Sequence, residues 1–250
     1  MASLCLPKMV FQDVSFQRVH HTAILKALRA LDGDYLMETK CYFGGGTAIV
    51  LELGEYRESI DIDFLCADQA GYRALRTAIA GQPNLNKLLR AGEELECLRE
   101  VRADQYGLRT VIRSQDTLIK LEIVRERRIN LQGMVDPRSG LPVLARTHMY
   151  AEKLMANSDR WYQPDVASRD ILDLSVMISR WGPIPDEAWA IAEEAYGTKA
   201  REDYEKAVEK IRKPEHIESC AKKMQIDIET VGEILALHGG AFERETSQFD

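Results

Sequence analysis

The sequence lacks the features of secreted and membrane-spanning proteins. Its five cysteines are odd in number and include no Cys-x-x-Cys pair, which argues against a disulfide framework or a zinc knuckle and favours a reducing compartment. The first residues show no basic segment followed by a long apolar run, so no signal peptide is expected. No apolar stretch approaches the length that spans a bilayer. We therefore expect a cytoplasmic protein with no membrane partner.

Positive charge is scarce in the chain as a whole. The 250 residues carry a net charge of −7 with a pI near 5.4, whereas a protein that coats nucleic acid is usually basic. The exception is the stretch 99–146, which holds ten Lys and Arg against six Asp and Glu. Two interpretations stay open for this stretch: a solvated charged face, which is the commoner case, or a local basic surface for RNA or polyphosphate.

Repeats and low-complexity segments are absent, and the hydrophobic pattern changes once along the chain. It predicts an α+β fold: a mixed sheet with helices over residues 1–143, followed by an α-helical domain over 144–250. The Pro- and Gly-punctuated stretch 134–144 marks the boundary. The predicted elements of the first domain are helices over 14–31, from Thr47 and over 68–80, and strands over 40–43, 59–66, 95–103, 106–114 and 117–126.

Three consecutive glycines lie between a predicted strand and a predicted helix. Glycines at such a junction allow the backbone to approach a ligand closely, and the N-terminus of the following helix favours an anion. Gly45, Gly46 and Thr47 are therefore candidates for binding the phosphates of a nucleotide, with the Thr47 hydroxyl as a helix cap or a phosphate ligand. An ordinary tight turn is the alternative.

Two aspartates alternate with apolar residues in the predicted strand that follows. Asp61 and Asp63 are two positions apart, so their side chains leave the same face of the strand, whereas Ile62 and Phe64 face the core. Neighbouring carboxylates repel each other unless a cation lies between them, and Mg²⁺ (or Mn²⁺) prefers such hard oxygen ligands. A solvent-facing strand edge with two charges is the alternative.

A third carboxylate would complete a metal centre. Glu122 is the best candidate, because it alternates with Leu121 and Ile123 in a predicted strand. Lys120 shares its face and is placed to contact a phosphate. A charge on the rim of the sheet is an equally plausible interpretation of Glu122.

The helical half contains a second group of candidates. Lys153 lies on a predicted helix, and its ammonium is a compact charge suited to a triphosphate. Arg169, Asp170 and Asp173 follow on the next helix, where positions 169 and 173 could form an ordinary i,i+4 pair. One of the two aspartates is expected to reach the active site while the other orients Lys153 or Arg169.

These two segments together resemble a known family. The first resembles the GG[S/T]…DxD signature of DNA polymerase beta-like nucleotidyltransferases, and more narrowly the AbiEii/AbiGii-type toxins. The resemblance covers roughly residues 40–175, and Gly44 departs from it, since family members often have lysine or serine there. The matching positions are Gly45, Gly46, Thr47, Ala48, Arg57, Ser59, Asp61, Asp63 and Phe64 in the first segment, and Lys153, Arg169, Asp170, Asp173 and Leu174 in the second.

The resemblance implies a metal-dependent nucleotidyltransferase that moves an NMP from an NTP to an acceptor hydroxyl. RNA, notably tRNA, is the implied acceptor, and a toxin–antitoxin or phage-defence role implies a cognate antitoxin protein. Transfer to a small molecule or a protein, and a non-catalytic nucleotide-binding scaffold, are the alternatives. The expected catalytic residues are Asp61, Asp63, Glu122, Lys153 and Asp170, the nucleotide-binding residues are Gly45, Gly46, Thr47, Lys153, Arg169 and Asp173, and the metal ligands are Asp61, Asp63 and Glu122.

Overall fold

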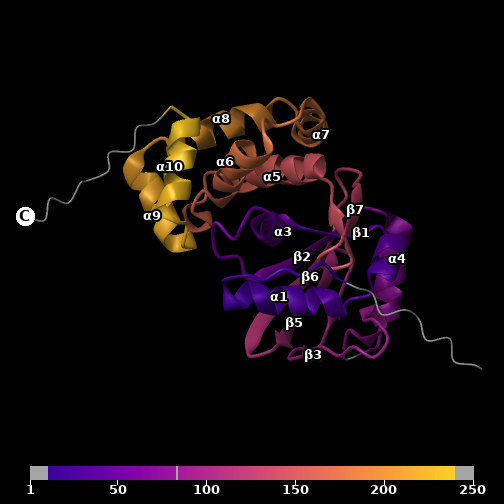
Figure 1. Ribbon diagram of the computed structural model, residues 1–250. Coiled ribbons are helices and arrows are strands. Elements are labelled where there is room, and N and C mark those ends of the chain that lie inside the picture. Colours follow the sequence, from indigo (N-terminus) through magenta and orange to yellow (C-terminus); the bar gives the residue numbers. More distant parts are fainter. Residues whose placement is uncertain (1–10, 83, 240–250) are drawn as a thin grey trace, which may run out of the picture. The chain divides into compact units, whose positions relative to one another are not determined.

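The computed structural model describes residues 11–82 and 84–239, and the chain divides into two compact units (Figure 1). The first unit consists of the described residues up to Gly44 together with Ile60–Leu144, and the second of Gly45–Ser59 together with the described residues from Ala145 onward. Residues 45–59 belong to the second unit, since the helix Gly45–Glu52 contacts the helices Arg146–Arg160 and Arg169–Trp181.

The first unit is built on a mixed sheet. Its strand order is β3-β5-β6-β2-β1-β8-β7, with β4 paired to β5. The pairs β2/β6 and β1/β8 are parallel, and the other pairs are antiparallel. The strands are β1 (Cys41–Gly44), β2 (Asp61–Cys66), β3 (Glu96–Cys97), β4 (Arg102–Ala103), β5 (Gly107–Ser114), β6 (Thr117–Arg125), β7 (Gly133–Asp136) and β8 (Leu141–Leu144).

Alternation along the central strands separates a buried face of this sheet from a more accessible one. Ile62 and Phe64 of β2 are buried, as are Leu121 and Ile123 of β6, because these positions lie on the same face of neighbouring strands. Helix α1 contacts β5 and β6, and the buried Ser114 hydroxyl donates to the carbonyl oxygen of an α1 residue at 2.8 Å. The helices of this unit are α1 (Val19–Ala30), α2 (Gly33–Glu38), α4 (Gln69–Ile79) and the short 3-10 helix η1 (Asn86–Leu88).

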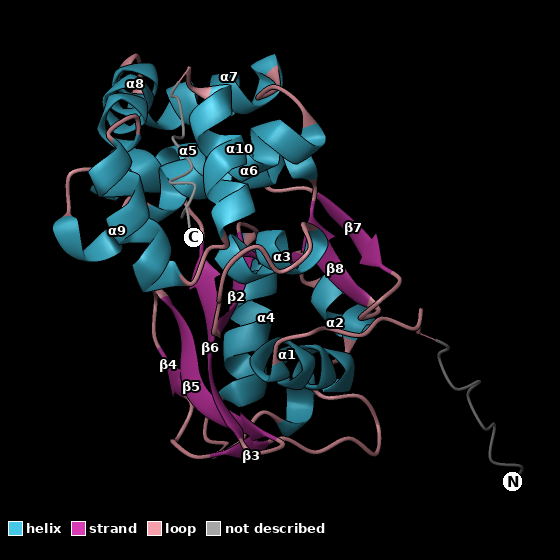
Figure 2. Cartoon of the chain, turned by 60° about the vertical axis from the view of Figure 1, so that its left-hand side comes forward, coloured by secondary structure: helices cyan, strands magenta, loops and turns pink. Residues whose placement is uncertain are grey.

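The second unit is helical (Figure 2). Helix α5 contacts α6, α7 and α8, and α10 contacts α6. Every residue of α6 from Asp170 to Met177 is buried, as expected for a helix surrounded by others. The α-helices are α3 (Gly45–Glu52), α5 (Arg146–Arg160), α6 (Arg169–Trp181), α7 (Asp186–Tyr196), α8 (Lys199–Ile211), α9 (Pro214–Met224) and α10 (Ile228–Leu237), and η2 (Pro164–Val166) is a short 3-10 helix. None of the helices in the described part of the chain has the length and apolar character that a membrane span requires.

The predicted α+β fold with a mixed sheet is confirmed, with differences in detail. The hairpin β7–β8 is not predicted, because the proline and glycine residues of 134–144 obscure two short strands that complete one side of the sheet. The strand predicted over 95–103 is two short strands that both pair with β5. Helix α3 begins at Gly45 rather than at Thr47.

The first helix also differs from the prediction. It begins at Val19 instead of residue 14, and a second helix, α2, begins at Gly33. The start of α2 is capped by Asp32, whose side chain accepts hydrogen bonds from the backbone N–H groups of Asp34 and Tyr35, both at 3.1 Å. This is the geometry of an N-cap.

Asp32→Ala is expected to lower the free energy of unfolding by about 1 kcal/mol, because two N–H groups of α2 lose their acceptor. Urea unfolding of the full chain measures this difference. Asp32→Asn retains an acceptor oxygen and is expected to stay within about 0.5 kcal/mol of the wild type. Equal losses for the two substitutions would contradict the capping role.

Candidate functional site

Asp61 and Asp63 lie on the accessible face of β2. Both are half-buried, and the residues between and after them, Ile62 and Phe64, are buried on the opposite face. On one side Asp63 pairs with Gly44, the last residue of β1, from which the chain continues into the glycine turn. Two carboxylates side by side on a rigid strand have the hard oxygen donors and the negative charge that a divalent cation requires. The pair therefore fits Mg²⁺ or Mn²⁺.

Glu122 is next to these aspartates but is already engaged. It pairs with Asp63 across the parallel strands, so its side chain leaves the same face. One carboxylate oxygen accepts from Arg109 Nε at 2.7 Å and the other from Lys120 Nζ at 2.6 Å. Glu122 would become a third metal ligand only by releasing one of these cations. Across residues 11–82 and 84–239, no three His, Cys, Asp or Glu side chains are arranged as a metal site.

Acidic groups on this face stabilise the positive charge of Lys120. The pKa of Lys120 is raised, first by its hydrogen bond to Glu122, against the opposing effect of burial, and further by the charges of Glu122, Asp61 and Asp63. A cation is therefore favoured at this position on the sheet.

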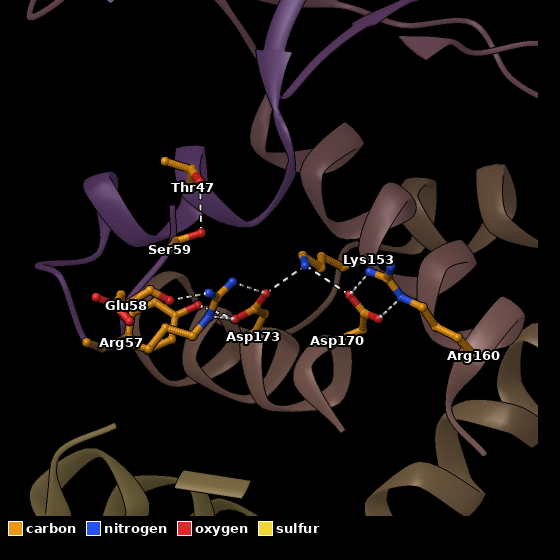
Figure 3. A network of polar contacts seen from close by, with 9 residues as sticks. Thr47, Arg57, Glu58, Ser59, Lys153, Arg160, Asp170 and Asp173 are labelled. Atoms are coloured by element: carbon orange, nitrogen blue, oxygen red, sulfur yellow. Dashed lines mark hydrogen bonds and ion pairs between the residues drawn. The ribbon is translucent and has the colours of Figure 1, made fainter. Parts of the chain in front are cut away.

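The glycine turn begins α3 in the second unit. Gly45 has a φ of 68°, a left-handed conformation that glycine adopts readily. The first N–H groups of a helix have no intrahelical acceptor, so they are suited to binding phosphate oxygens. The Thr47 side chain is buried, and its hydroxyl forms a hydrogen bond of 2.8 Å with the Ser59 hydroxyl (Figure 3).

Arg57 lies directly against this turn. A methyl group at Gly46 would overlap the Nη2 atom of Arg57, so an alanine at this position would require the guanidinium to move. The guanidinium is fixed in place by a two-point contact with Asp173, with Nε to Oδ1 at 2.7 Å and Nη2 to Oδ2 at 2.9 Å. Tyr56 Oη donates to the same Oδ1 at 2.6 Å.

Lys153 connects this pair to a second one. Its ammonium contacts Asp173 Oδ2 at 2.6 Å and Asp170 Oδ1 at 3.0 Å, and Asp170 in turn accepts two hydrogen bonds from Arg160, at 2.6 and 2.9 Å. Cations and anions alternate in the order Arg57, Asp173, Lys153, Asp170, Arg160, which we call the buried charge chain (Figure 3). Three cations and two anions give it a net charge of +1.

The pKa values of both aspartates agree with this pairing. Burial would raise the pKa of Asp170, but Lys153 and Arg160 outweigh burial and lower it from 3.8 to about 2. Burial acts in the same direction on Asp173, and Arg57 and Lys153 likewise bring its pKa well below the usual range. Both carboxylates are therefore ionised at neutral pH.

The predicted residues thus fall into two groups, one in each unit. Asp61, Asp63 and Glu122 share a sheet face in the first unit, and Lys153 contacts both predicted aspartates in the second. Arg169 does not pair with Asp173, and its side chain forms no ion pair with an acidic group among the described residues.

Sequence reasoning misses three participants. Arg57 matches the family motif, but the sequence suggests no role for it because its partner, Asp173, is more than a hundred positions away. Tyr56 bonds the same distant carboxylate. Arg160 follows Lys153 by seven residues, which is two helical turns, and this spacing on α5 is the available signal.

Comparison with known proteins identifies a matching family. The sequence model described as "Nucleotidyl transferase AbiEii toxin, Type IV TA system" matches residues 26–237. No curated protein gives a significant match. Among solved structures, a candidate nucleotidyltransferase from Helicobacter pylori is 15% identical over 90% of this chain and 95% of that chain, with a TM-score of 0.47. An antigenic nucleotidyltransferase-like protein from Paracoccidioides brasiliensis is 13% identical (78% and 94% covered, TM-score 0.40), and JHP933 from Helicobacter pylori is 18% identical (84% and 100% covered, TM-score 0.31).

Gly46→Ala is expected to destabilise the protein by about 1–2 kcal/mol, because the added methyl displaces a guanidinium that Asp173 holds in place. Arg57→Lys removes the Nη2 atom and keeps the charge. In that background the cost of Gly46→Ala should fall by at least about 0.5 kcal/mol, which a double-mutant cycle by urea unfolding measures. Strict additivity of the two substitutions would refute the contact.

Acid titration tests the ionisation of Asp170. Because folding lowers its pKa, its ionisation stabilises the protein above about pH 4, and this contribution, about 2 kcal/mol, is lost as the pH falls towards 2. Asp170→Asn should therefore be much less stable than the wild type at pH 6, and the difference should shrink by about that amount near pH 2. The control is Asp165→Asn, at an exposed position in the same unit. If the stability of the control differs from the wild type with a pH dependence of similar size, the ionisation of Asp170 is not the source of the pH dependence.

Proposed function

The chain belongs to the AbiEii family of nucleotidyltransferase toxins, and on this premise we propose that it transfers an NMP from an NTP to a hydroxyl of an RNA, in particular a tRNA. The acceptor oxygen forms a bond to the α-phosphorus while the bond from that phosphorus to its bridging oxygen breaks. Pyrophosphate leaves with the electron pair, and the proton of the acceptor passes to a base or to water. Such a transfer depends mainly on positioning and on neutralisation of phosphate charge.

The observation that carries this proposal is the pairing of Gly44 with Asp63. It means that β1, which leads into the glycine turn, ends opposite the carboxylate strand. Asp61 and Asp63 would hold Mg²⁺ or Mn²⁺, which when bound neutralises charge on the reacting phosphates. Glu122 would act as the base for the acceptor hydroxyl or as a third metal ligand, and either role requires it to release Arg109 or Lys120.

The second unit supplies the groups for the triphosphate. The N–H groups of Gly45, Gly46 and Thr47 would bind phosphate oxygens. Lys153 would contribute positive charge, and the net charge of the buried charge chain supports this role. Asp170 and Asp173 then act as positioning residues, because each is buried and binds the Lys153 ammonium.

Arg169 completes the set of nucleotide-binding candidates. It is half-buried at the first position of α6, and no carboxylate in the described part of the chain neutralises it. A guanidinium in this state is suited to a phosphate oxygen. A cytoplasmic location and a cognate antitoxin protein as partner belong to the same proposal, since the family is one of toxin–antitoxin systems.

Asp63→Asn is expected to reduce kcat/KM for transfer by at least about 100-fold, because it removes a charge needed at the reacting phosphates and leaves the side-chain volume unchanged. The assay follows each α-labelled NTP with Mg²⁺ and total RNA. Asp116→Asn, at an exposed position in the turn between β5 and β6, is the matched control and should keep wild-type activity.

Normal turnover by Asp63→Asn would refute the assigned role of Asp63. Label that enters a small molecule or the protein itself, rather than RNA, would replace the RNA acceptor with one of those classes. Binding of the NTP without transfer to any acceptor would favour a non-catalytic scaffold.

A further inference from the structure

The first unit contains a pocket of about 550 Å³ lined mainly by cations. Arg99, Arg102, Arg109 and Lys120 contribute to its wall, and Glu100 is the acidic residue among those that line it. Its volume lies within the range of pockets that hold small ligands or parts of larger ones. In a chain with a net charge of −7, this concentration of positive charge points to an anionic ligand.

Strand register places this pocket on the same sheet face as the carboxylates. Asp63 pairs with Glu122, Glu122 with Arg109, and Arg109 with Arg102, so the four residues form one row across β2, β6, β5 and β4. Paired residues project from the same face of a sheet. The row therefore changes from acidic to basic over two strand spacings, roughly 10 Å, between β2 and β5.

The four cations of the pocket differ in whether they are already neutralised. Arg109 and Lys120 both bind Glu122, at 2.7 and 2.6 Å. The side chains of Arg99 and Arg102 are exposed, and within the described residues neither guanidinium forms an ion pair or a hydrogen bond. The planar guanidinium binds two phosphate oxygens at once, so these two side chains are suited to phosphate groups.

The shape of the charged row favours an extended polyanion. The guanidinium groups follow successive strands away from Asp61 and Asp63, so a strand whose reacting end lies at the carboxylates would carry its next phosphates over the pocket. In the proposed function the phosphates of the NTP bind the glycine turn and Lys153, so the pocket is left to the acceptor.

We propose that this pocket binds the backbone phosphates of a single-stranded RNA acceptor, next to the nucleotide whose hydroxyl reacts. This inference rests on the proposed function, and it adds a binding site with Arg99 and Arg102 as the principal contacts. Because these contacts are with phosphates, the pocket supports affinity without reading the base sequence.

Binding of a fluorescein-labelled 12-nucleotide RNA, measured by anisotropy on the full chain carrying Asp63→Asn, tests the site without turnover. Adding Arg99→Ala and Arg102→Ala should weaken binding at least 10-fold. The slope of log Kd against the logarithm of the salt concentration should also fall by about 0.7 for each phosphate that the protein no longer neutralises. The matched control, Arg73→Ala with Arg127→Ala, removes the same charge from exposed positions outside the pocket.

An unchanged Kd and salt slope would overturn the inference, and so would an equal loss of affinity in the control. If micromolar inorganic triphosphate displaces the RNA, and does so only when Arg99 and Arg102 are present, the pocket is a site for free polyphosphate instead of RNA.

A transfer assay separates this inference from the proposed function. In otherwise wild-type protein, Arg99→Ala with Arg102→Ala should raise the KM for RNA about 10-fold. Transfer to RNA with an unaltered KM would leave the proposed function intact and refute the pocket. Binding of RNA that depends on Arg99 and Arg102, in a protein that transfers no nucleotide to RNA, would support the pocket and refute the function.

Discussion

The arrangement of the second unit depends on the buried charge chain. A charge removed from water is costly unless it is paired and hydrogen-bonded, so each member of the chain requires its neighbours. Arg57 follows α3, Lys153 lies on α5 and Asp173 on α6, and the ion pairs between them fix these three segments relative to one another. Removing Asp173 would leave the buried Arg57 guanidinium without a carboxylate partner, at a cost of about 3–5 kcal/mol. The same interactions hold the guanidinium that lies against Gly46, so the geometry of the glycine turn depends on a carboxylate far away in the sequence.

The sheet of the first unit places charge by a different physical rule. Side chains alternate between the two faces of a strand, and residues paired across neighbouring strands project from the same face. A row of paired residues therefore gathers its side chains on one surface. On β2 that surface carries Asp61 and Asp63, and towards β4 it carries Arg109 and Arg102. Glu122 lies between the two ends, where it neutralises Arg109 and Lys120. An acidic end and a basic end therefore follow from one register, and a slip of one residue would turn both towards the core.

Much of this fold is visible in the periodicity of the sequence. Strict alternation around Asp61 and Asp63 and around Glu122 identifies β2 and β6, because one face of each strand is buried. The local sequence pattern does not predict features that depend on short strands, on caps or on residues far away in the chain. The hairpin β7–β8 has short strands around a Pro- and Gly-containing turn, and α1 starts later than its apolar residues indicate. Arg57 shows no sign of its partner Asp173, since an ion pair between distant segments leaves no periodic trace.

By itself the sequence determined the α+β class, the strand that carries the two aspartates, the glycine turn and the family resemblance, because each of these depends on residues within a few positions of one another. Only the tertiary structure decided the pairings. It joined Asp173 to Arg57 instead of Arg169, placed Lys153 between two aspartates, and engaged Glu122 with two cations. It also aligned Arg102 and Arg109 with the carboxylates. The physical reason is that Coulomb attraction and burial act through space, so the partner of a charge is chosen by packing and strand register rather than by distance along the chain.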